Sequence, residues 1–366
     1  MIKDVGQIPY FMSKNYGYDS SIVSYRVSDN YFHKDGEVKG ITLNFLDNNG
    51  RIFFIERAVV SYLFKNAKST DVFNLYHLTK ETFVYGLLYK MFNPKGFLYI
   101  KLDVYNEMLR SDIVYSKNKI KNYFLKLLEK RLTKKADLFS VENREGLELF
   151  KMRFPNTTEK TIYLPNGVND IFLQKEFSVL KKYSEKENLI ITTGRIGMNV
   201  KNHEMILRAI AKVDLKGWKL YLVGPVHPPF MIFFEESCKT HPRLKEVVFF
   251  TGEVRDRKQL YEWYNKAKIF CMTSPHESFG ISIVEAMYFG NYVIGTEGIS
   301  TIKDLTNNGS LGAVVKLNDD DTLAKTFETL INNEKLISEK QDEIMKYLRE
   351  NFLWSKLTAR LNNRIN

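Results

Sequence analysis

Two glutamates in the C-terminal third of the chain have a spacing that suits ligand binding. In "HESFGISIVEAMYFG" (276–290), Glu277 and Glu285 stand eight positions apart, with Gly280 between them. Pro275 ends the preceding strand, and an apolar helix follows as far as Gly290. The first N–H groups of such a helix attract phosphate, and a carboxylate accepts hydrogen bonds from neighbouring hydroxyls. The element suits a ligand with phosphate and sugar groups; its structural alternative is an amphipathic helix with two solvated glutamates.

A second stretch offers positive charge in a similar position. In "TTGRIGMNVKN" (192–202), Arg195 and Lys201 flank a loop that contains Gly194 and Gly197, directly after an apolar strand. Two fixed cations at the end of a strand suit a diphosphate. The stretch has neither the dinucleotide-binding fingerprint nor the P-loop spacing. A solvated loop with two ordinary surface charges is the alternative.

The elements around these residues predict an α/β fold. Short apolar strands rich in β-branched residues alternate with amphipathic helices along the whole chain, which indicates parallel sheets covered on both faces. A chain of 366 residues is too long for one core. We expect a first domain over 1–172, a polar linker at 173–187, a second domain over 188–340, and a C-terminal helix, 341–366, that crosses back to the first domain. In the first half, helices are expected at 51–69, 81–92 and 116–136.

Composition narrows the class of protein. The two cysteines, Cys238 and Cys271, lack metal-ligand spacing, and we expect both to be buried, reduced thiols. The N-terminus has no signal-like apolar segment, and no apolar run approaches the about 20 residues of a membrane span. Asp319 and Asp321 form a D-x-D pattern before a helix, which favours capping over metal binding. These features predict a cytoplasmic, metal-independent protein, with a peripheral position at the inner face of the membrane left open.

Positive charge is concentrated in one segment. The net charge is +11, and residues 114–135 carry eight basic side chains against one acidic residue, Glu129. A solvated helix face, attraction to anionic lipid headgroups and nucleic-acid binding all remain open. Nucleic acid is the weakest of the three, because the aromatic residues of this helix lie on its apolar face, which is expected to pack. That face consists of Ile120, Tyr123, Phe124, Leu127 and Leu128.

Taken together, these motifs resemble a known family. "HESFGISIVEAMYFG" resembles the E-x7-E element of retaining family-4 glycosyltransferases (glycosyl transferases group 1), and "GRIGMNVKN" resembles their G-R-loop-K segment. "YLPNGVNDIF" (163–172) resembles their P-N-G-V segment, and "FTGEVRDRKQLYEWYNKAKIFCMTS" (250–274) the stretch that contacts the nucleotide base. The resemblance implies the GT-B fold, two doubly wound Rossmann-like domains with an interdomain cleft.

The resemblance also implies an activity. It is the metal-independent, retaining transfer of a hexose from a UDP- or GDP-linked sugar to a hydroxyl of a glycan or lipid-linked acceptor, in cell-surface polysaccharide or glycolipid synthesis. Glu285 would hold the ribose, Glu277 would contact the donor sugar, and Arg195 and Lys201 would stabilise the departing diphosphate. No protein nucleophile is expected, and no cofactor besides the donor substrate. Further donor contacts would come from Gly194, Val254, Arg255, Phe279, Gly280, Ile281 and Gly298.

The N-terminal half departs from the family pattern. The family opens with a strand and a glycine-rich loop, whereas "MIKDVGQIPYFMSKN" resembles the loop and helix after that strand. The first strand is therefore expected to be missing or displaced, with Gly6 in the place of the loop on the acceptor side. The family often has a histidine after the strand matched by 95–104, where this chain has Asp103, a candidate catalytic residue or a simple turn residue. His77 is an acceptor-side candidate or a structural histidine.

Two other functions fit parts of the pattern. A sugar-nucleotide epimerase or phosphorylase could use the same fold, and a basic nucleic-acid-binding protein would explain the charge alone. The transferase interpretation predicts a nucleotide sugar and a glycan or lipid-linked acceptor as partners, an anionic membrane surface at 117–135 as a further candidate, and no nucleic acid.

Overall fold

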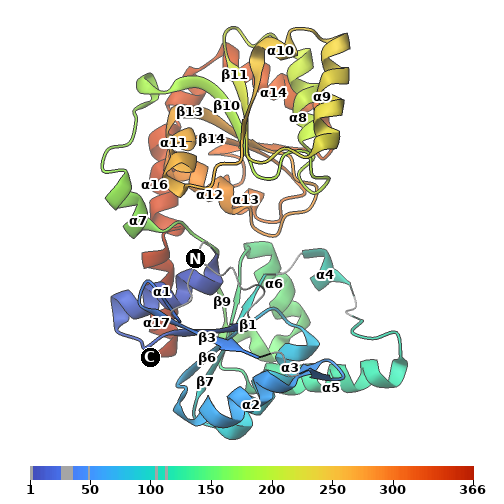
Figure 1. Cartoon of the computed structure of the whole chain (residues 1–366), viewed down its shortest axis with the longest axis vertical. Helices are drawn as coiled ribbons and strands as arrows, with labels where there is room; N and C mark the ends of the chain where they lie inside the picture. Colours follow the sequence, from blue (N-terminus) through green and yellow to red (C-terminus); the bar gives the residue numbers. More distant parts are fainter. Residues whose placement is uncertain (1–2, 26–35, 48–49, 104–105, 112–113) are drawn as a thin grey trace. The chain divides into compact units, whose positions relative to one another are not determined.

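The computed structural model describes residues 3–25, 36–47, 50–103, 106–111 and 114–366, so the end of the first expected strand (20–27) lies outside the described residues. The chain divides into two units (Figure 1). Unit 1 comprises Met1–Asn166 and Trp354–Asn366, and unit 2 comprises Gly167–Leu353. Among the described residues, no helix combines the length and the apolar character that crossing a membrane requires.

Unit 1 contains strands and helices in alternation. Its elements are α1 (Asp4–Tyr16), β1 (Ser21–Tyr25), β2 (Glu37–Val38), β3 (Ile41–Leu46), β4 (Arg51–Ile52), β5 (Ile55–Glu56), α2 (Arg57–Asn66), η1 (Ala67–Ser69), β6 (Val72–Tyr76), α3 (Lys80–Phe92), β7 (Phe97–Leu102), α4 (Asn106–Arg110), α5 (Lys119–Lys135), β8 (Leu138–Val141), α6 (Arg144–Arg153), η2 (Pro155–Lys160), β9 (Thr161–Tyr163) and α17 (Trp354–Ile365).

The described strands of unit 1 form a parallel sheet and smaller pieces. The sheet has the order β6-β7-β8-β9, and β1, β3 and β2 form a separate sheet. The helix expected at 51–69 starts only at Arg57, because the six residues before it fold into the β4–β5 hairpin. Arg51 pairs with Glu56 across this hairpin, and Phe53 takes a positive φ of 58° in its turn.

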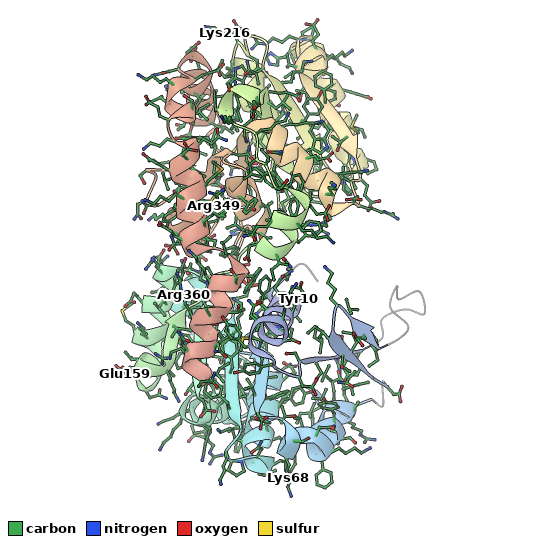
Figure 2. All side chains as sticks on the ribbon, turned by 90° about the vertical axis from the view of Figure 1, so that its left-hand side faces the viewer. Tyr10, Lys68, Glu159, Lys216, Arg349 and Arg360 are labelled. Carbon is green, nitrogen blue, oxygen red and sulfur yellow. The ribbon has the colours of Figure 1, made fainter. Side chains whose placement is uncertain are left out.

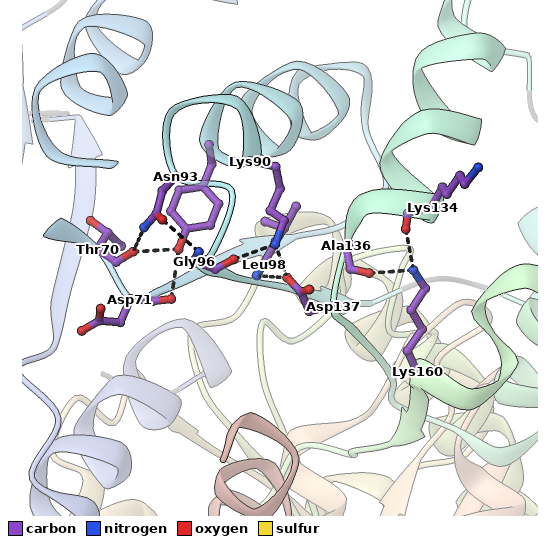
Figure 3. A network of polar contacts seen from close by, with 11 residues as sticks. Thr70, Asp71, Lys90, Asn93, Gly96, Leu98, Lys134, Ala136, Asp137 and Lys160 are labelled. Atoms are coloured by element: carbon purple, nitrogen blue, oxygen red, sulfur yellow. Dashed lines mark hydrogen bonds and ion pairs between the residues drawn. The ribbon is translucent and has the colours of Figure 1, made fainter. Parts of the chain in front are cut away.

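A network of polar contacts ties together the amino ends of the strands in unit 1 (Figure 3). The Tyr89 hydroxyl donates to the carbonyl oxygen of Thr70 at 2.7 Å, and Lys90 Nζ contacts Asp137 Oδ2 at 2.9 Å. Lys160 Nζ donates to the carbonyl of Ala136 at 2.6 Å. These contacts satisfy buried polar groups and fix the strands at this edge. The opposite, carboxyl edge is the one available for ligand chemistry in open α/β sheets.

The last helix of the chain belongs to unit 1. Helix α17 packs beside α1, where the Tyr18 hydroxyl donates to Asn362 Oδ1 at 3.1 Å. Figure 2 labels Tyr10 on α1 and Arg360 on α17, and Arg364 Nη2 donates to the carbonyl of Glu159 at 2.6 Å. The segment expected as one helix, 341–366, is therefore two helices, and the boundary between the units falls at Leu353.

Unit 2 contains one larger parallel sheet. Its elements are α7 (Asp170–Glu176), η3 (Tyr183–Glu185), β10 (Glu187–Thr193), α8 (His203–Lys212), β11 (Lys219–Val223), α9 (Pro228–Thr240), α10 (Leu244–Val247), β12 (Val248–Gly252), α11 (Arg257–Lys266), β13 (Ala267–Met272), α12 (Ile281–Tyr288), β14 (Tyr292–Thr296), α13 (Ile302–Leu305), β15 (Gly312–Val315), α14 (Asp320–Asn332), α15 (Lys335–Ser338) and α16 (Gln341–Asn351). The expected linker at 173–187 is part of this unit, because Leu173 and Phe177 pack in its core.

Both faces of the unit 2 sheet are covered by apolar side chains, as its uninterrupted apolar strands predict. One core lies between the sheet and α8, α9 and α14 and includes Trp218, Phe230 and Phe327. The other lies between the sheet and α7, α11, α12 and α16. Cys238 and Cys271 are buried and unpaired in this unit, as expected.

Candidate functional site

The sheet of unit 2 has a switch point that defines where a ligand is expected. The strand order is β12-β11-β10-β13-β14-β15, so the chain leaves β10 toward one side of the sheet and β13 toward the other. Ligands of open parallel sheets bind outside the carboxyl ends of the strands at such a point. The loops that follow β10 and β13 are 194–202 and 273–280. They contain the two stretches that the sequence singles out.

These two loops are joined by an ion pair. Lys201 Nζ lies 2.6 Å from Glu277 Oε2, and the side chains are 21% and 23% exposed. The Thr273 hydroxyl donates to the carbonyl oxygens of Lys201 and Asn202 at 3.1 and 2.8 Å. An ammonium group has three N–H donors, so pairing with one carboxylate leaves Lys201 able to bind phosphate oxygens as well. Arg195 lies in the first loop with an exposed side chain.

The loop after β10 is held in place by close backbone packing. Gly194 and Gly224 have φ values of 141° and 142°, and a Cβ on Gly224 would lie 1.9 Å from the carbonyl oxygen of Gly194. The Gly197 N–H donates to His203 Nδ1 at 3.0 Å. Burial of His203, with a smaller contribution from Lys201, lowers its pKa to about 3, so this ring stays neutral and accepts the bond. The loop that carries Arg195 and Lys201 is therefore held in a fixed conformation.

The stretch around Glu277 is equally well fixed. The N–H of Glu277 donates to the carbonyl of Gly298 at 3.1 Å, and its carbonyl accepts from the N–H of Ser300 at 2.9 Å. A Cβ on Gly298 would lie 2.2 Å from the carbonyl oxygen of Pro275, so only glycine allows the two segments to approach this closely. Gly298 thus has a structural role here in addition to the predicted donor contact.

Helix α12 begins where the sequence predicts its N-terminus. Gly280 precedes it with a φ of 83°, and Ile281 is its first residue. Phe279 is buried, and its carbonyl oxygen accepts a hydrogen bond from the Thr301 hydroxyl. The first N–H groups of α12 have no partner within the helix by geometry, which makes this end a suitable place for phosphate.

Glu285 lies one turn into α12 and is buried, with 4% of its surface exposed. Arg257 Nη2 donates to its Oε1, and the hydroxyl groups of Tyr261 and Tyr264 lie 3.4 and 3.3 Å from its oxygens. Burial acts to lower the pKa of Arg257, but Glu285 and Tyr261 raise it above its usual value. Glu285 is therefore a buried acceptor held by Arg257 and not a solvated surface residue.

The sequence interpretation missed the three partners of Glu285. Arg257, Tyr261 and Tyr264 occupy positions i, i+4 and i+7 of α11, so they share one face of that helix. The spacing of one cation and two hydroxyl groups on one helix face was the sequence signal that could have identified these partners. Val254 and Arg255 lie in the loop between β12 and α11, where Arg255 is exposed and pairs with Glu253 at 2.9 Å.

The carboxyl edge of the unit 1 sheet brings together two further candidates. His77 follows β6 and Asp103 follows β7; His77 Nδ1 lies 3.1 Å from the carbonyl oxygen of Asp103. His77 has a φ of 61°, a conformation that is uncommon for a residue other than glycine. Among the described residues, Asp103 Oδ1 is buried without a hydrogen-bond partner. Both candidates therefore lie at this edge of the sheet.

A buried charged cluster beside them was not predicted. Lys101 is fully buried and contacts Glu142 at 2.8 Å and Asp4 at 3.6 Å. Asn166 Nδ2 donates to Glu142 Oε1 at 2.7 Å. Burial raises the pKa of Glu142 to about 7, against the opposing effect of Lys101. Glu142 Oε2 and Asn166 Oδ1 have no partner in the described part of the chain, so hydrogen-bond acceptors remain available here.

Gly6 does not form the predicted loop. It lies inside α1, where its N–H donates to the carbonyl of Lys3 at 3.0 Å, because the chain is already helical from Asp4. The D-x-D pattern behaves as a cap: Asp319 Oδ1 accepts from the N–H of Thr322 at 2.9 Å, and Asp321 pairs with Lys212. In the described residues, no group of three or more histidine, cysteine or acidic side chains is arranged to hold a metal ion.

Solved structures define the class of fold. HepE of Anabaena in complex with UDP superimposes with a TM-score of 0.72 at 16% identity, over 98% of this chain and 95% of that one. A glycosyltransferase from Rickettsia africae ESF-5 gives a TM-score of 0.74 at 18% identity, over 99% and 92% of the two chains. The chain therefore has a fold of the GT-B type.

Sequence comparisons relate the chain to a narrower class of protein than the fold alone does. Residues 174–351, which lie within unit 2, match the family model described as glycosyl transferases group 1. Two relatives come from Campylobacter jejuni subsp. jejuni. One is an α-1,4-N-acetyl-D-galactosaminyltransferase named for a diphospho-undecaprenol-linked acceptor, 32% identical over 49% of this chain and 50% of its own length. The other is a diphospho-undecaprenol 4-α-N-acetylgalactosaminyltransferase, 24% identical over 69% of this chain and 65% of its own length. The chain thus matches only half to two thirds of these relatives.

Proposed function

We propose that this protein is a retaining, metal-independent glycosyltransferase that moves a hexose from a UDP- or GDP-linked donor to a hydroxyl of a glycan or lipid-linked acceptor. The observation that carries the proposal is the Lys201–Glu277 pair at the switch point of the unit 2 sheet, beside the N-terminus of α12. The match of this unit to the glycosyl transferases group 1 model and the names of the Campylobacter relatives support it. No cofactor besides the donor is required.

The anionic part and the neutral part of the donor would contact different groups of the protein. Lys201, Arg195 and the first N–H groups of α12 would contact the diphosphate. When the sugar–oxygen bond breaks, negative charge grows on the departing nucleoside diphosphate, and fixed cations and amides stabilise this charge without having to reorganise. Glu277 would keep Lys201 in position and accept hydrogen bonds from sugar hydroxyls.

The ribose would contact Glu285. Its carboxylate already accepts from Arg257 and from tyrosine hydroxyls, and a carboxylate has about four lone-pair sites, so one site would remain for a ribose hydroxyl. The backbone of Phe279, Gly280 and Ile281 would contact sugar and phosphate. Gly194, Val254 and Arg255 would lie along the nucleoside.

The acceptor would bind at the carboxyl edge of the unit 1 sheet. Asp103 and His77 lie there, with the buried acceptor oxygens of Glu142 and Asn166 nearby in the fold. Hydrogen-bond acceptors of this kind suit the hydroxyl groups of a sugar. The relatives' names, which specify lipid-linked glycans, favour an acceptor used in cell-surface polysaccharide or glycolipid synthesis.

Nucleotide binding tests the donor site directly. We expect UDP or GDP, and the matching nucleotide sugar, to raise the melting temperature, because a ligand that binds only the folded state stabilises it. Lys201→Met and Glu285→Gln should each weaken nucleotide binding at least about tenfold, the size of a lost charge-assisted hydrogen bond. Isothermal titration calorimetry of each variant measures the change.

Matched variants control for charge and for helix position. Lys212→Met removes a lysine at the other end of α8, and Glu262→Gln an exposed glutamate on α11; both should bind nucleotide as the parent does. Undiminished binding in Lys201→Met and Glu285→Gln would refute the site. Mass spectrometry of the donor incubated alone separates transfer from epimerisation, since an isomerised nucleotide sugar without any acceptor would favour the epimerase.

A further inference from the structure

Helix α5 leaves three residues of its expected apolar face exposed, whereas Leu128 packs against the core of unit 1. Leu125 and Leu132 are buried against unit 1, whereas Ile120, Tyr123 and Phe124 are 71%, 64% and 59% exposed. In a long helix that packs against a domain, such apolar residues normally face the core. Exposed apolar groups that cluster on one element mark an interaction site more often than scattered ones do.

The exposed face continues as a basic surface along the same helix. Residues 120, 123, 124 and 127 follow helical spacing, and positions 130, 131 and 134 continue it with Lys130, Arg131 and Lys134, all exposed. The acidic residue of this segment, Glu129, is buried and accepts a hydrogen bond from the Tyr115 hydroxyl. The exposed stripe of α5 is therefore apolar in its first half and cationic in its second, with Lys119 and Lys121 exposed beside the apolar part.

A second apolar element lies at the start of α5. Phe53, at the tip of the β4–β5 hairpin, is 89% exposed, and Ile52 is 50% exposed. The Nζ of Lys121 lies 5.7 Å from the ring centroid of the adjacent Phe54, which places the hairpin tip beside the first turn of α5. Phe53 also holds a φ of 58°, which glycine or asparagine would adopt more easily. Stability does not explain an exposed phenylalanine at this position.

We propose that these residues form one membrane-docking surface, in which Ile52, Phe53, Ile120, Tyr123 and Phe124 enter the headgroup region of an anionic bilayer and the lysines and arginine of α5 bind its headgroups. An amphipathic helix with aromatic residues on one side and basic residues beside them lies in such an interface. Each basic residue near an anionic surface adds to the binding. The surface is defined independently of the proposed transferase activity.

The chemistry favours lipid over nucleic acid. Nucleic acid would be recognised by aromatic rings that stack on bases, with phosphate contacts around them. Ile52 and Ile120 have no ring to stack, and they are 50% and 71% exposed. Hydrocarbon beside cationic groups is complementary to acyl chains beneath anionic headgroups.

Vesicle sedimentation tests the surface. The full chain should bind vesicles of phosphatidylcholine mixed with phosphatidylglycerol and bind phosphatidylcholine alone at least about tenfold more weakly. The triple variant Ile120→Ser, Tyr123→Ser, Phe124→Ser keeps the net charge and should lose most of the binding to anionic vesicles. Lys130→Gln, Arg131→Gln, Lys134→Gln should weaken it at least about tenfold.

Matched triples on unit 2 serve as controls. Val179→Ser, Ile232→Ser, Leu336→Ser and Lys216→Gln, Lys239→Gln, Lys325→Gln change exposed residues of the same kinds and should leave vesicle binding unchanged. Circular dichroism and thermal melting check that every variant is folded. A Phe124→Trp variant adds a direct readout, since tryptophan fluorescence should shift to shorter wavelength on anionic vesicles.

Three outcomes would overturn the proposal. They are full vesicle binding by the apolar triple, equal binding to neutral and anionic vesicles, and no shift in Phe124→Trp fluorescence. Preferential binding of single-stranded DNA that the apolar triple retains would point to nucleic acid instead. Loss of vesicle binding with intact nucleotide binding would leave the donor site untouched, so the two proposals succeed or fail separately.

Discussion

At the scale of single residues, the donor-side charges of unit 2 are held by partners from other elements. Glu277 is paired with Lys201 from the loop after β10, and Glu285 with Arg257 from α11. The sequence predicts that Glu277 precedes a helix and that Glu285 lies inside it, and the structure has this arrangement. The cation that pairs with each glutamate depends on the order of the strands in the sheet. The local sequence does not determine that order.

His203 gives a test at this scale, because its ring supports the loop that carries Lys201. Burial lowers its pKa to about 3, whereas an unfolded histidine titrates near 6.5. The unfolded state therefore binds more protons between these values, and stability should fall as the pH drops from about 6.5 toward 3, by about 1.4 kcal/mol for each unit of pKa difference at most.

The variant His203→Asn isolates this effect. Asparagine offers an oxygen that can accept from the Gly197 N–H but does not titrate, so its melting temperature should depend less on pH over this range. Melting temperatures measured from pH 7 to pH 4 for both proteins give the comparison. Identical pH dependence in the parent and the variant would mean that His203 is not the group responsible.

At the scale of elements, the regular segments of unit 2 were predictable from the sequence, whereas two features of unit 1 were not. The strand that ends before Pro275 and the apolar helix that ends at Gly290 were expected where β13 and α12 lie, because the apolar runs and these two residues mark them. The β4–β5 hairpin was missed, since "RIFFIE" reads equally well as the start of a helix and its turn rests on a phenylalanine with positive φ. The exposed face of α5 was missed because periodicity identifies an apolar face without showing what covers it.

The contact between the loops after β10 and β11 supports a second prediction. In Gly224→Ala the new Cβ would meet the backbone of Gly194, which cannot move aside as a side chain would. We expect a loss of several kcal/mol in the free energy of unfolding, above the roughly 1–2 kcal/mol of a positive φ alone. Urea denaturation measures the loss.

Gly217→Ala is the matched control for this change. Gly217 has a φ of 85°, but a Cβ added to it would meet nothing within 4 Å, so alanine there tests backbone strain without a clash. Its cost should stay near roughly 1–2 kcal/mol. Equal losses in the two variants would show that the close approach of Gly194 and Gly224 contributes nothing.

At the scale of the whole molecule, the chain enters and leaves unit 2 at neighbouring points. The N–H of Val168 donates to the carbonyl of Phe352 at 2.9 Å, and Val168 pairs in parallel with Leu353. Val168, Phe352 and Leu353 also pack in the core of unit 2. Unit 2 is thus an inserted domain with adjacent ends, an arrangement in which both parts commonly fold separately.

This arrangement predicts the behaviour of three shorter polypeptides. Residues 167–353 should fold alone, melt cooperatively and bind nucleotide, because both cores of unit 2 lie within them. Residues 1–166 joined to 354–366 through a short Gly-Ser linker should also fold. Residues 1–166 alone should be unstable, because α1 would lose α17, whose Leu357 and Leu361 are buried. Circular dichroism melts of all three decide the matter: if 1–166 melts as high as the joined polypeptide, α17 adds nothing to unit 1, and if 167–353 stays unfolded, unit 2 is not an independent domain.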